Sequence, residues 1–279
     1  MQMWIKKLLL ILLLCSVCQA ANDFSNDVNC VALYRFEDGA LTTDTIGSNT
    51  LTNSNATVYT VAAKEGAGCV DLYSSFETDY MYRADAGLDS GFPGKSGGTI
   101  ASFSLCYWVW IGSAPEEGSY ETFASKWYVS GSAKTWWTGV NTTSGDMSFK
   151  LLSGYNSGAS TEIISHGTTA VIHSWYHVGI TWVQSTKAWK MRIWDDTAGA
   201  LLGGAEATGT ATNEMSADSA PIIFGNINDL TYESECYLDE FVVFKDELSS
   251  AEIDQIRAGT YAVAAPPASG GQVIMIQEF

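Results

Sequence analysis

The serine, histidine and acidic residues of this sequence do not combine into a catalytic pattern. Residues 94–98 (GKSGG) fit the G-x-S-x-G nucleophile elbow, but that turn joins a strand to a helix, and here strand-like segments lie on both sides. His173 and His177 lie four residues apart in a strand-like segment, which separates them by about 13 Å. Asp239 and Glu240 are adjacent, so they face opposite sides of a sheet and cannot pair as glycosidase acids do. We therefore expect no enzymatic activity, and a glycoside hydrolase is the least favoured alternative.

Asp239 is more readily explained as a metal ligand. In the strand-like segment around it, Asp239 has the same parity as Phe241, so it should face the core, where an unpaired carboxylate is costly. The acidic turn at Glu37 and Asp38, together with Asp44, could share a calcium ion with it, because calcium prefers carboxylate and carbonyl oxygens. We predict a structural calcium ion at these four residues. The alternative is that Asp239 accepts backbone N–H bonds from a loop without a metal.

Aromatic residues beside turns are the candidates for ligand contact. An indole or phenol ring at a strand end can stay partly exposed and can stack on a sugar ring. We select Tyr128, Trp136 and Trp137 as the stacking residues. The alternative for each tryptophan is a place in the core.

Residues 1–20 have the pattern of a secretory signal peptide. Lys6 and Lys7 precede the apolar run 8–14, and a small residue at Ala20 precedes the expected cleavage site. The alternatives are a buried N-terminal helix or a membrane anchor, although the apolar run is short for a membrane span. We expect a secreted product, in the extracellular space, at the cell surface or in the periplasm, without membrane insertion after cleavage.

Four cysteines remain after this leader is removed. In an oxidising compartment an even number favours disulfides, here two bonds with three possible connectivities. The alternative is four buried free thiols. The residues are Cys30, Cys69, Cys106 and Cys236.

The charge of the chain restricts its partners. Fourteen Lys and Arg residues stand against 31 acids, for a net charge of −17. Loss of Lys6 and Lys7 with the leader would bring this to −19 (−17 − 2). No basic stripe is available to bind phosphates, so nucleic acid is excluded. Acidic polysaccharides and anionic membranes are disfavoured as well.

Short alternating segments separated by Gly-, Ser-, Thr- and Asn-rich turns fill residues 28–245. This pattern predicts an all-β fold, an antiparallel two-sheet jelly-roll sandwich, in one domain over residues 21–261. Ser249 and Glu252 form a capping box, which predicts one short C-terminal helix that ends near Gly259.

The last residues have a different composition. Residues 262–271 (AVAAPPASGG) are predicted to be a linker, and residues 272–279 (QVIMIQEF) a strand-like tail. The tail either folds back onto its own sheet or pairs with the edge of another molecule, which would produce a homo-oligomer.

Five segments in the same order give this chain a resemblance to the laminin G-like, concanavalin A-like domains of bacterial exported proteins. They are 33–38 (LYRFED), 103–109 (FSLCYWV), 175–182 (WYHVGITW), 192–196 (RIWDD) and 238–253, where LDEFVVF leads into LSSAEI. The resemblance covers residues 30–261. It implies a jelly-roll sandwich that binds glycans or proteins, often with one calcium ion near the first and last strands. Those ion positions would correspond to Glu37, Asp38 and Asp239.

The expected function is therefore non-enzymatic binding outside the cell. A glycan is the favoured partner, and an extracellular protein is possible under the same resemblance. The alternative is a structural subunit that assembles by donating residues 272–279 to a neighbour.

Overall fold

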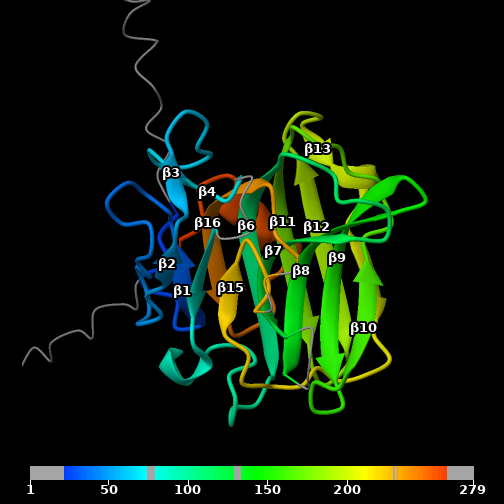
Figure 1. The fold of residues 1–279 in the computed structure, drawn as a ribbon. Coiled ribbons are helices and arrows are strands. Elements are labelled where there is room, and N and C mark those ends of the chain that lie inside the picture. The colour runs from blue at the N-terminus through cyan, green and yellow to red at the C-terminus, as the bar shows by residue number, and fades with distance from the viewer. Residues whose placement is uncertain (1–21, 74–78, 129–132, 229, 231, 263–279) are drawn as a thin grey trace, which may run out of the picture.

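The computed structural model describes residues 22–73, 79–128, 133–228, 230 and 232–262. Within them, two β-sheets stack face to face, and every pair of neighbouring strands in each sheet is antiparallel. Figure 1 shows the two layers of strands. The predicted all-β sandwich with a single short helix near its C-terminal end is confirmed.

One sheet has nine strands. Along its main path the order is β13 (Ala200–Leu201), β12 (Ala188–Asp195), β11 (Trp175–Val183), β6 (Ser102–Ile111), β16 (Cys236–Phe244), β4 (Cys69–Asp71) and β3 (Thr57–Tyr59). Off this path, β1 (Cys30–Tyr34) pairs with β16, and β14 (Ala207–Thr210) pairs with β12. The first and last strands of the fold are therefore neighbours.

The other sheet has seven strands. Their order is β10 (Ser160–Ser165), β9 (Asp146–Tyr155), β8 (Lys134–Thr143), β7 (Tyr120–Trp127), β15 (Ile222–Phe224), β5 (Tyr80–Arg83) and β2 (Thr52–Ser54). The three long strands β7, β8 and β9 lie side by side, so they form a broad surface that can position side chains rigidly.

The main core lies between the two sheets, because one face of each long strand is apolar. Tyr107 of β6 stacks on Phe241 of β16 with ring centroids 4.9 Å apart, and Phe224 of β15 meets Phe241 edge-on at 4.8 Å from the opposite sheet. Each such aromatic pair adds about 0.5–1.5 kcal/mol beyond the area it buries. The first contact lies within the nine-stranded sheet, and the second joins the two sheets.

The helix α2 (Ser250–Arg257) begins with the predicted capping box. The Ser249 hydroxyl accepts from the Glu252 backbone N–H, and the Glu252 carboxylate accepts from the Ser249 N–H at 2.7 Å. Ile253 and Ile256 are buried against the outer side of the nine-stranded sheet. The helix thus covers part of that sheet, whereas the outer side of the seven-stranded sheet has no helix over it among the described residues.

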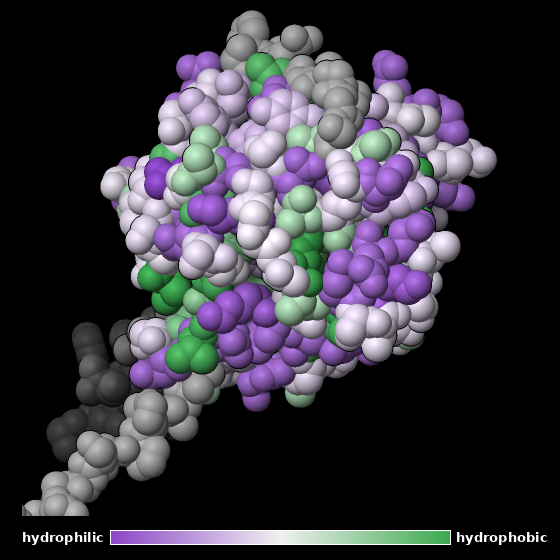
Figure 2. Space-filling model, turned by 90° about the horizontal axis from the view of Figure 1, so that it is seen from below, coloured by the Kyte–Doolittle hydropathy of each residue, from purple (hydrophilic) through white to green (hydrophobic). Residues whose placement is uncertain are grey.

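Several predictions fall on other parts of the chain. The signal peptide at 1–20, all but the first residue of the linker at 262–271 and the tail at 272–279 lie outside the described residues. In the described part, no helix combines the length and the apolar composition that crossing a membrane requires. Figure 2, a view from below, shows mostly hydrophilic and intermediate residues, with apolar ones in separate patches.

Candidate functional site

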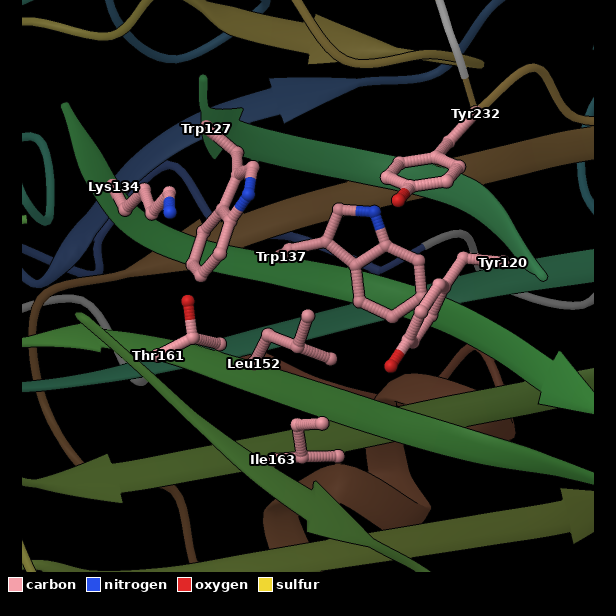
Figure 3. A pocket seen from close by; sticks show the side chains of 8 residues that line it. All are labelled: Tyr120, Trp127, Lys134, Trp137, Leu152, Thr161, Ile163 and Tyr232. Atoms are coloured by element: carbon pink, nitrogen blue, oxygen red, sulfur yellow. The ribbon is translucent and has the colours of Figure 1, made fainter. Parts of the chain in front are cut away.

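A pocket of about 180 Å³ lies on the outer side of the seven-stranded sheet. Figure 3 shows the side chains that line it, which come from four neighbouring strands and one loop. They are Tyr120 and Trp127 of β7, Lys134 and Trp137 of β8, Leu152 of β9, Thr161 and Ile163 of β10, and Tyr232 of the segment before β16. Four of the eight are aromatic, so the pocket is defined by ring surfaces.

Trp137 forms the floor of this pocket. Its indole N–H donates to the Thr122 hydroxyl of β7 over 2.7 Å, and only 1% of the residue is exposed. Gly139 makes room for the ring, because a Cβ at that position would lie 2.6 Å from the indole. A hydrogen bond on one edge and a glycine beside the ring hold the indole in one orientation.

Two tyrosines form one wall of the pocket. Tyr120 meets Trp137 edge-on, with ring centroids 5.4 Å apart and planes at 88°. Tyr232 packs edge-on against Tyr120 at 5.5 Å. Both tyrosines are half-buried, so part of each ring is available to a ligand.

The opposite end of the pocket carries polar groups. The Lys134 ammonium lies 5.7 Å from the centre of the Trp127 ring, and Thr161 contributes a hydroxyl nearby (Figure 3). Ile163 is 56% exposed at the rim. This combination suits a ligand with an apolar ring face, which packs on the aromatic rings, and polar edges, which hydrogen-bond to Lys134 and Thr161.

The structure separates the three predicted stacking residues. Trp137 lines the pocket, although it is almost fully buried. Trp136 is 0% exposed between the sheets, and its N–H donates to the Pro93 carbonyl over 3.2 Å, so the prediction of ligand contact is wrong for this residue. Tyr128 is half-buried just after β7 and does not line the pocket.

Sequence reasoning missed Tyr120, Trp127 and Tyr232. Strand alternation would have separated Trp136 from Trp137, since adjacent residues face opposite sides of a sheet. Strict alternation would instead have placed Trp127 on the face opposite Tyr120, because the two residues are seven positions apart. Both line the pocket because the pairing of β7 with β8 is irregular between Thr122 and Ala124. Tyr232 lies in an irregular segment, where no periodic signal exists.

Asp44, one of the four residues predicted to bind calcium, organises a loop through backbone hydrogen bonds. One carboxylate oxygen accepts from the N–H groups of Leu33, Ile46 and Gly47, each at 3.0 Å. The other accepts from the backbone and side chain of Asn49 at 3.1 and 2.8 Å. Five N–H donors point at this carboxylate, which is the opposite of the environment that a cation requires.

Asp239 does not face the core between the sheets. Glu240 has a positive φ of 48°, and the pairing of β16 with β6 is irregular between Asp239 and Val242. This β-bulge adds a residue, so Leu238 and Phe241, three positions apart, both face the core. The prediction from strand parity is therefore wrong about the direction of Asp239.

Asp239 is nevertheless fully buried on the outer side of its sheet, under a loop. One carboxylate oxygen accepts from the backbone N–H groups of Lys64 and Glu65 at 2.7 and 3.0 Å, which is the alternative considered for the sequence. Burial, together with the neighbouring carboxylates of Glu240 and Glu65, raises the pKa of Asp239 to about 8, although the two backbone N–H bonds act in the opposite direction. Asp239 thus holds the loop that contains Lys64 and Glu65 against the nine-stranded sheet through these two hydrogen bonds.

The four predicted calcium ligands are not gathered into one site. Glu37 accepts from the Ala67 N–H at 2.9 Å, Asp38 is exposed, and Asp44 and Asp239 are engaged as described above. Across the described residues, no group of three or more His, Cys, Asp or Glu side chains is arranged to hold a metal ion. These four residues do not fit a shared calcium ion. Calcium binding by the protein stays a prediction for which the structure offers no site among the described residues.

The two predicted disulfides are not formed in the structure. The four cysteines are buried free thiols, namely Cys30, Cys69, Cys106 and Cys236. Cys30 lies opposite Phe244 of β16, and Cys106 lies opposite Val242 on the other side of the same strand. With β16 between them, their Cα atoms are about 10 Å apart, beyond the reach of a disulfide. Burial raises the pKa of the Cys69 thiol to about 12 and that of the other three further still.

Several solved structures share the fold. The binding domain of Paraclostridial Mosquitocidal Protein 1 matches with a TM-score of 0.56 at 13% identity, over 82% of this chain and 52% of that chain. The binding domain of botulinum neurotoxin DC in complex with SialylT matches with a TM-score of 0.58 at 16% identity, over 84% and 52%. This chain therefore spans about half the length of the toxin domains it matches.

A third match covers nearly the whole of the other chain. Domain 4 of AbnA, a GH43 extracellular arabinanase from Geobacillus stearothermophilus, in complex with arabinotriose, has a TM-score of 0.54 at 15% identity, over 82% of this chain and 98% of that domain. No protein-family model and no curated protein matches the chain. At these identities the likeness shows the fold, and by fold the chain is a β-sandwich domain.

Proposed function

We propose that this protein is an exported, non-enzymatic module that binds a glycan in the aromatic pocket of the seven-stranded sheet. The observation that carries the proposal is the set of rings at Tyr120, Tyr232 and Trp137, held by mutual edge-on packing and by the Thr122 hydrogen bond. Pyranose and furanose rings have an apolar face that packs on such surfaces. Their hydroxyls would reach Lys134 and Thr161 at the polar end.

Among the described residues that line the aromatic pocket, none carries a carboxylate. Glutamates line the neighbouring pocket that shares Tyr120 and Tyr232, so the non-enzymatic role is proposed from the sequence, in which no pair of glycosidase acids was found. The resemblance to concanavalin A-like domains and the fold shared with domains solved with arabinotriose and SialylT support a glycan as the ligand class. Calcium has no part in this proposal, because its predicted ligands do not converge.

A glycan array with three proteins tests the proposal. Wild type should bind a subset of neutral glycans. Tyr232→Ala, which removes one pocket wall, should weaken that binding at least about tenfold, as expected for an aromatic contact residue. The matched control is Tyr59→Ala, a half-buried tyrosine that stacks on Tyr237 at 4.5 Å on the other sheet, and it should bind as wild type does. Equal losses in both variants, or no glycan bound, would contradict the proposal.

A further inference from the structure

A second pocket adjoins the aromatic one at the end of the sandwich. It has a volume of about 360 Å³ and shares Tyr120 and Tyr232 with the aromatic pocket. Four glutamates line it, namely Glu116, Glu121, Glu233 and Glu235. The Gly112 N–H donates to the Glu235 carbonyl over 2.7 Å, which ties the end of β6 to the segment that carries two of these acids. A ligand on the two tyrosines would therefore extend into an acidic chamber.

Glu121 is the buried group of this chamber. Only 5% of the residue is exposed. One carboxylate oxygen accepts from the Ser113 hydroxyl over 2.8 Å, and the other is buried with no hydrogen-bond partner. Because a buried polar atom without a partner costs about 1–3 kcal/mol, native proteins rarely retain one without a reason. A donor supplied by a ligand would satisfy this oxygen.

The electrostatics of the chamber favour a donor with positive charge. Among the described residues that line it there is no Lys, Arg or His. Burial, followed by the charges of Glu235 and Glu233, raises the pKa of Glu121 to about 8. A bound cation would offset the repulsion among these carboxylates, whereas an anion would add to it.

We propose that the acidic chamber binds the ammonium group of an amino sugar whose ring packs on Tyr120 and Tyr232. This inference rests on the proposed function, since the same tyrosines hold the sugar ring. An ammonium group has three donors, so it can bond to the unpartnered oxygen of Glu121 and to a second acceptor. The faces of the tyrosine rings add cation–π attraction.

A divalent metal fits the chamber less well than an ammonium group. Calcium takes six to eight oxygen ligands at about 2.3–2.6 Å. In the part of the chain that the structure describes, no three acidic, His or Cys side chains are close enough together to provide such a shell. An ammonium group needs fewer acceptors and tolerates wider spacing, and the adjoining aromatic wall suits an organic ligand.

Three tetrasaccharides that differ only at C2 test the inference, namely the tetramers of glucosamine, N-acetylglucosamine and glucose in the same linkage. At pH 6.5 the amine is charged, and Glu121, whose pKa is about 8 in the free protein, releases its proton as the ammonium group binds. Calorimetry at this pH should show that wild type binds the glucosamine tetramer at least about tenfold more tightly than the other two. Glu121→Gln should abolish this preference and leave binding of the neutral tetramers unchanged. Glu247→Gln, an exposed acid outside the chamber, changes the net charge equally and should keep the preference.

Two results would overturn the inference. One is a glucosamine tetramer that binds no better than the glucose tetramer, or not at all. The other is a preference that survives in Glu121→Gln. If Glu121→Gln melts at a lower temperature than wild type, Glu235→Gln on the half-exposed wall takes its place, with a reduced preference expected and an unchanged one contradicting the proposal.

The same titrations separate this inference from the proposed function. Loss of neutral-glycan binding in Tyr232→Ala without any amine preference in wild type would support the aromatic pocket and reject the ammonium site. An amine preference that depends on Glu121 and survives in Tyr232→Ala would reject the aromatic pocket instead.

Discussion

The indole N–H of Trp137 and the hydroxyl of Thr122 form a buried hydrogen bond of 2.7 Å between β8 and β7. Thr122 is 0% exposed and lies opposite Gly139, the residue that leaves space beside the Trp137 ring. The floor of the aromatic pocket is thus built by two adjacent strands rather than by a loop. A site on paired strands keeps its geometry without a ligand, which lowers the entropic cost of binding.

Thr122→Val should leave the Trp137 N–H buried without an acceptor. Valine has the shape of threonine, so the expected effect is that of the lost hydrogen bond, about 1–3 kcal/mol of unfolding free energy. Denaturant unfolding measures this loss, and glycan affinity should fall with it. Thr122→Ser retains the hydroxyl and serves as the control, and equal stability of the valine and serine variants would contradict the assigned role.

Gly139→Ala should distort the pocket. The added Cβ would lie 2.0 Å from the Glu121 carbonyl oxygen and 2.6 Å from the Trp137 ring, so backbone or indole must move. Overpacking of this kind costs about 1–3 kcal/mol. Gly91→Ala is the matched control, because its nearest neighbours would be side-chain atoms at 3.6 Å. Thermal unfolding of both variants checks the prediction, which fails if they melt alike.

How the protein responds to pH should depend on Asp239. Burial raises its pKa to about 8, and burial likewise raises the pKa values of Glu65 to about 7 and of Glu240 to about 6. The folded protein therefore holds protons that the unfolded chain, with ordinary carboxyl pKa values of about 4, has released. The contribution of these three groups to the free energy of unfolding is therefore greatest below pH 4, and it is lost as the pH rises through 6 to 8.

Asp239→Asn should reduce this loss. The asparagine carbonyl can still accept from the Lys64 and Glu65 N–H groups, and it has no proton to lose. Unfolding free energy measured from pH 5 to pH 9 should fall less steeply than in wild type, with the variant more stable by at least about 1 kcal/mol at pH 9. Asp38→Asn, an exposed change of equal charge, should keep the wild-type slope. Parallel slopes for wild type and Asp239→Asn would contradict the assignment.

From the hydrogen bonds of Asp44 we predict that calcium does not affect the stability of the protein through this residue. Because five N–H donors surround its carboxylate, Asp44→Asn should destabilise the protein by about 1–3 kcal/mol whether or not calcium is present. Melting temperatures in calcium and in EDTA should agree for the wild type and for the variant. A melting temperature that calcium raises in wild type but not in Asp44→Asn would instead support the predicted calcium site.

Local patterns in the sequence were sufficient for the architecture. Alternating segments separated by turn residues predicted the sandwich, and the Ser249 and Glu252 pair predicted the start of α2, because both signals depend on near neighbours in the chain. The direction of Asp239 could not be predicted, since the bulge at Glu240 breaks the parity of β16.

The site required information that periodicity does not contain. Trp137 was selected beside Trp136, which faces the core, and the wall residue Tyr232 reaches the pocket from an irregular segment. The pairing of cysteines was argued from their number and compartment alone. The strand order places β16 between Cys30 and Cys106, which keeps these two residues too far apart for a disulfide.

A crystal structure of the protein with its tightest-binding neutral glycan would test the central proposal most directly. We predict a sugar ring against Tyr120 and Tyr232, with hydroxyls bonded to Lys134 or Thr161. A glycan bound on the outer side of the nine-stranded sheet or on the rim loops, with the aromatic pocket empty, would contradict it.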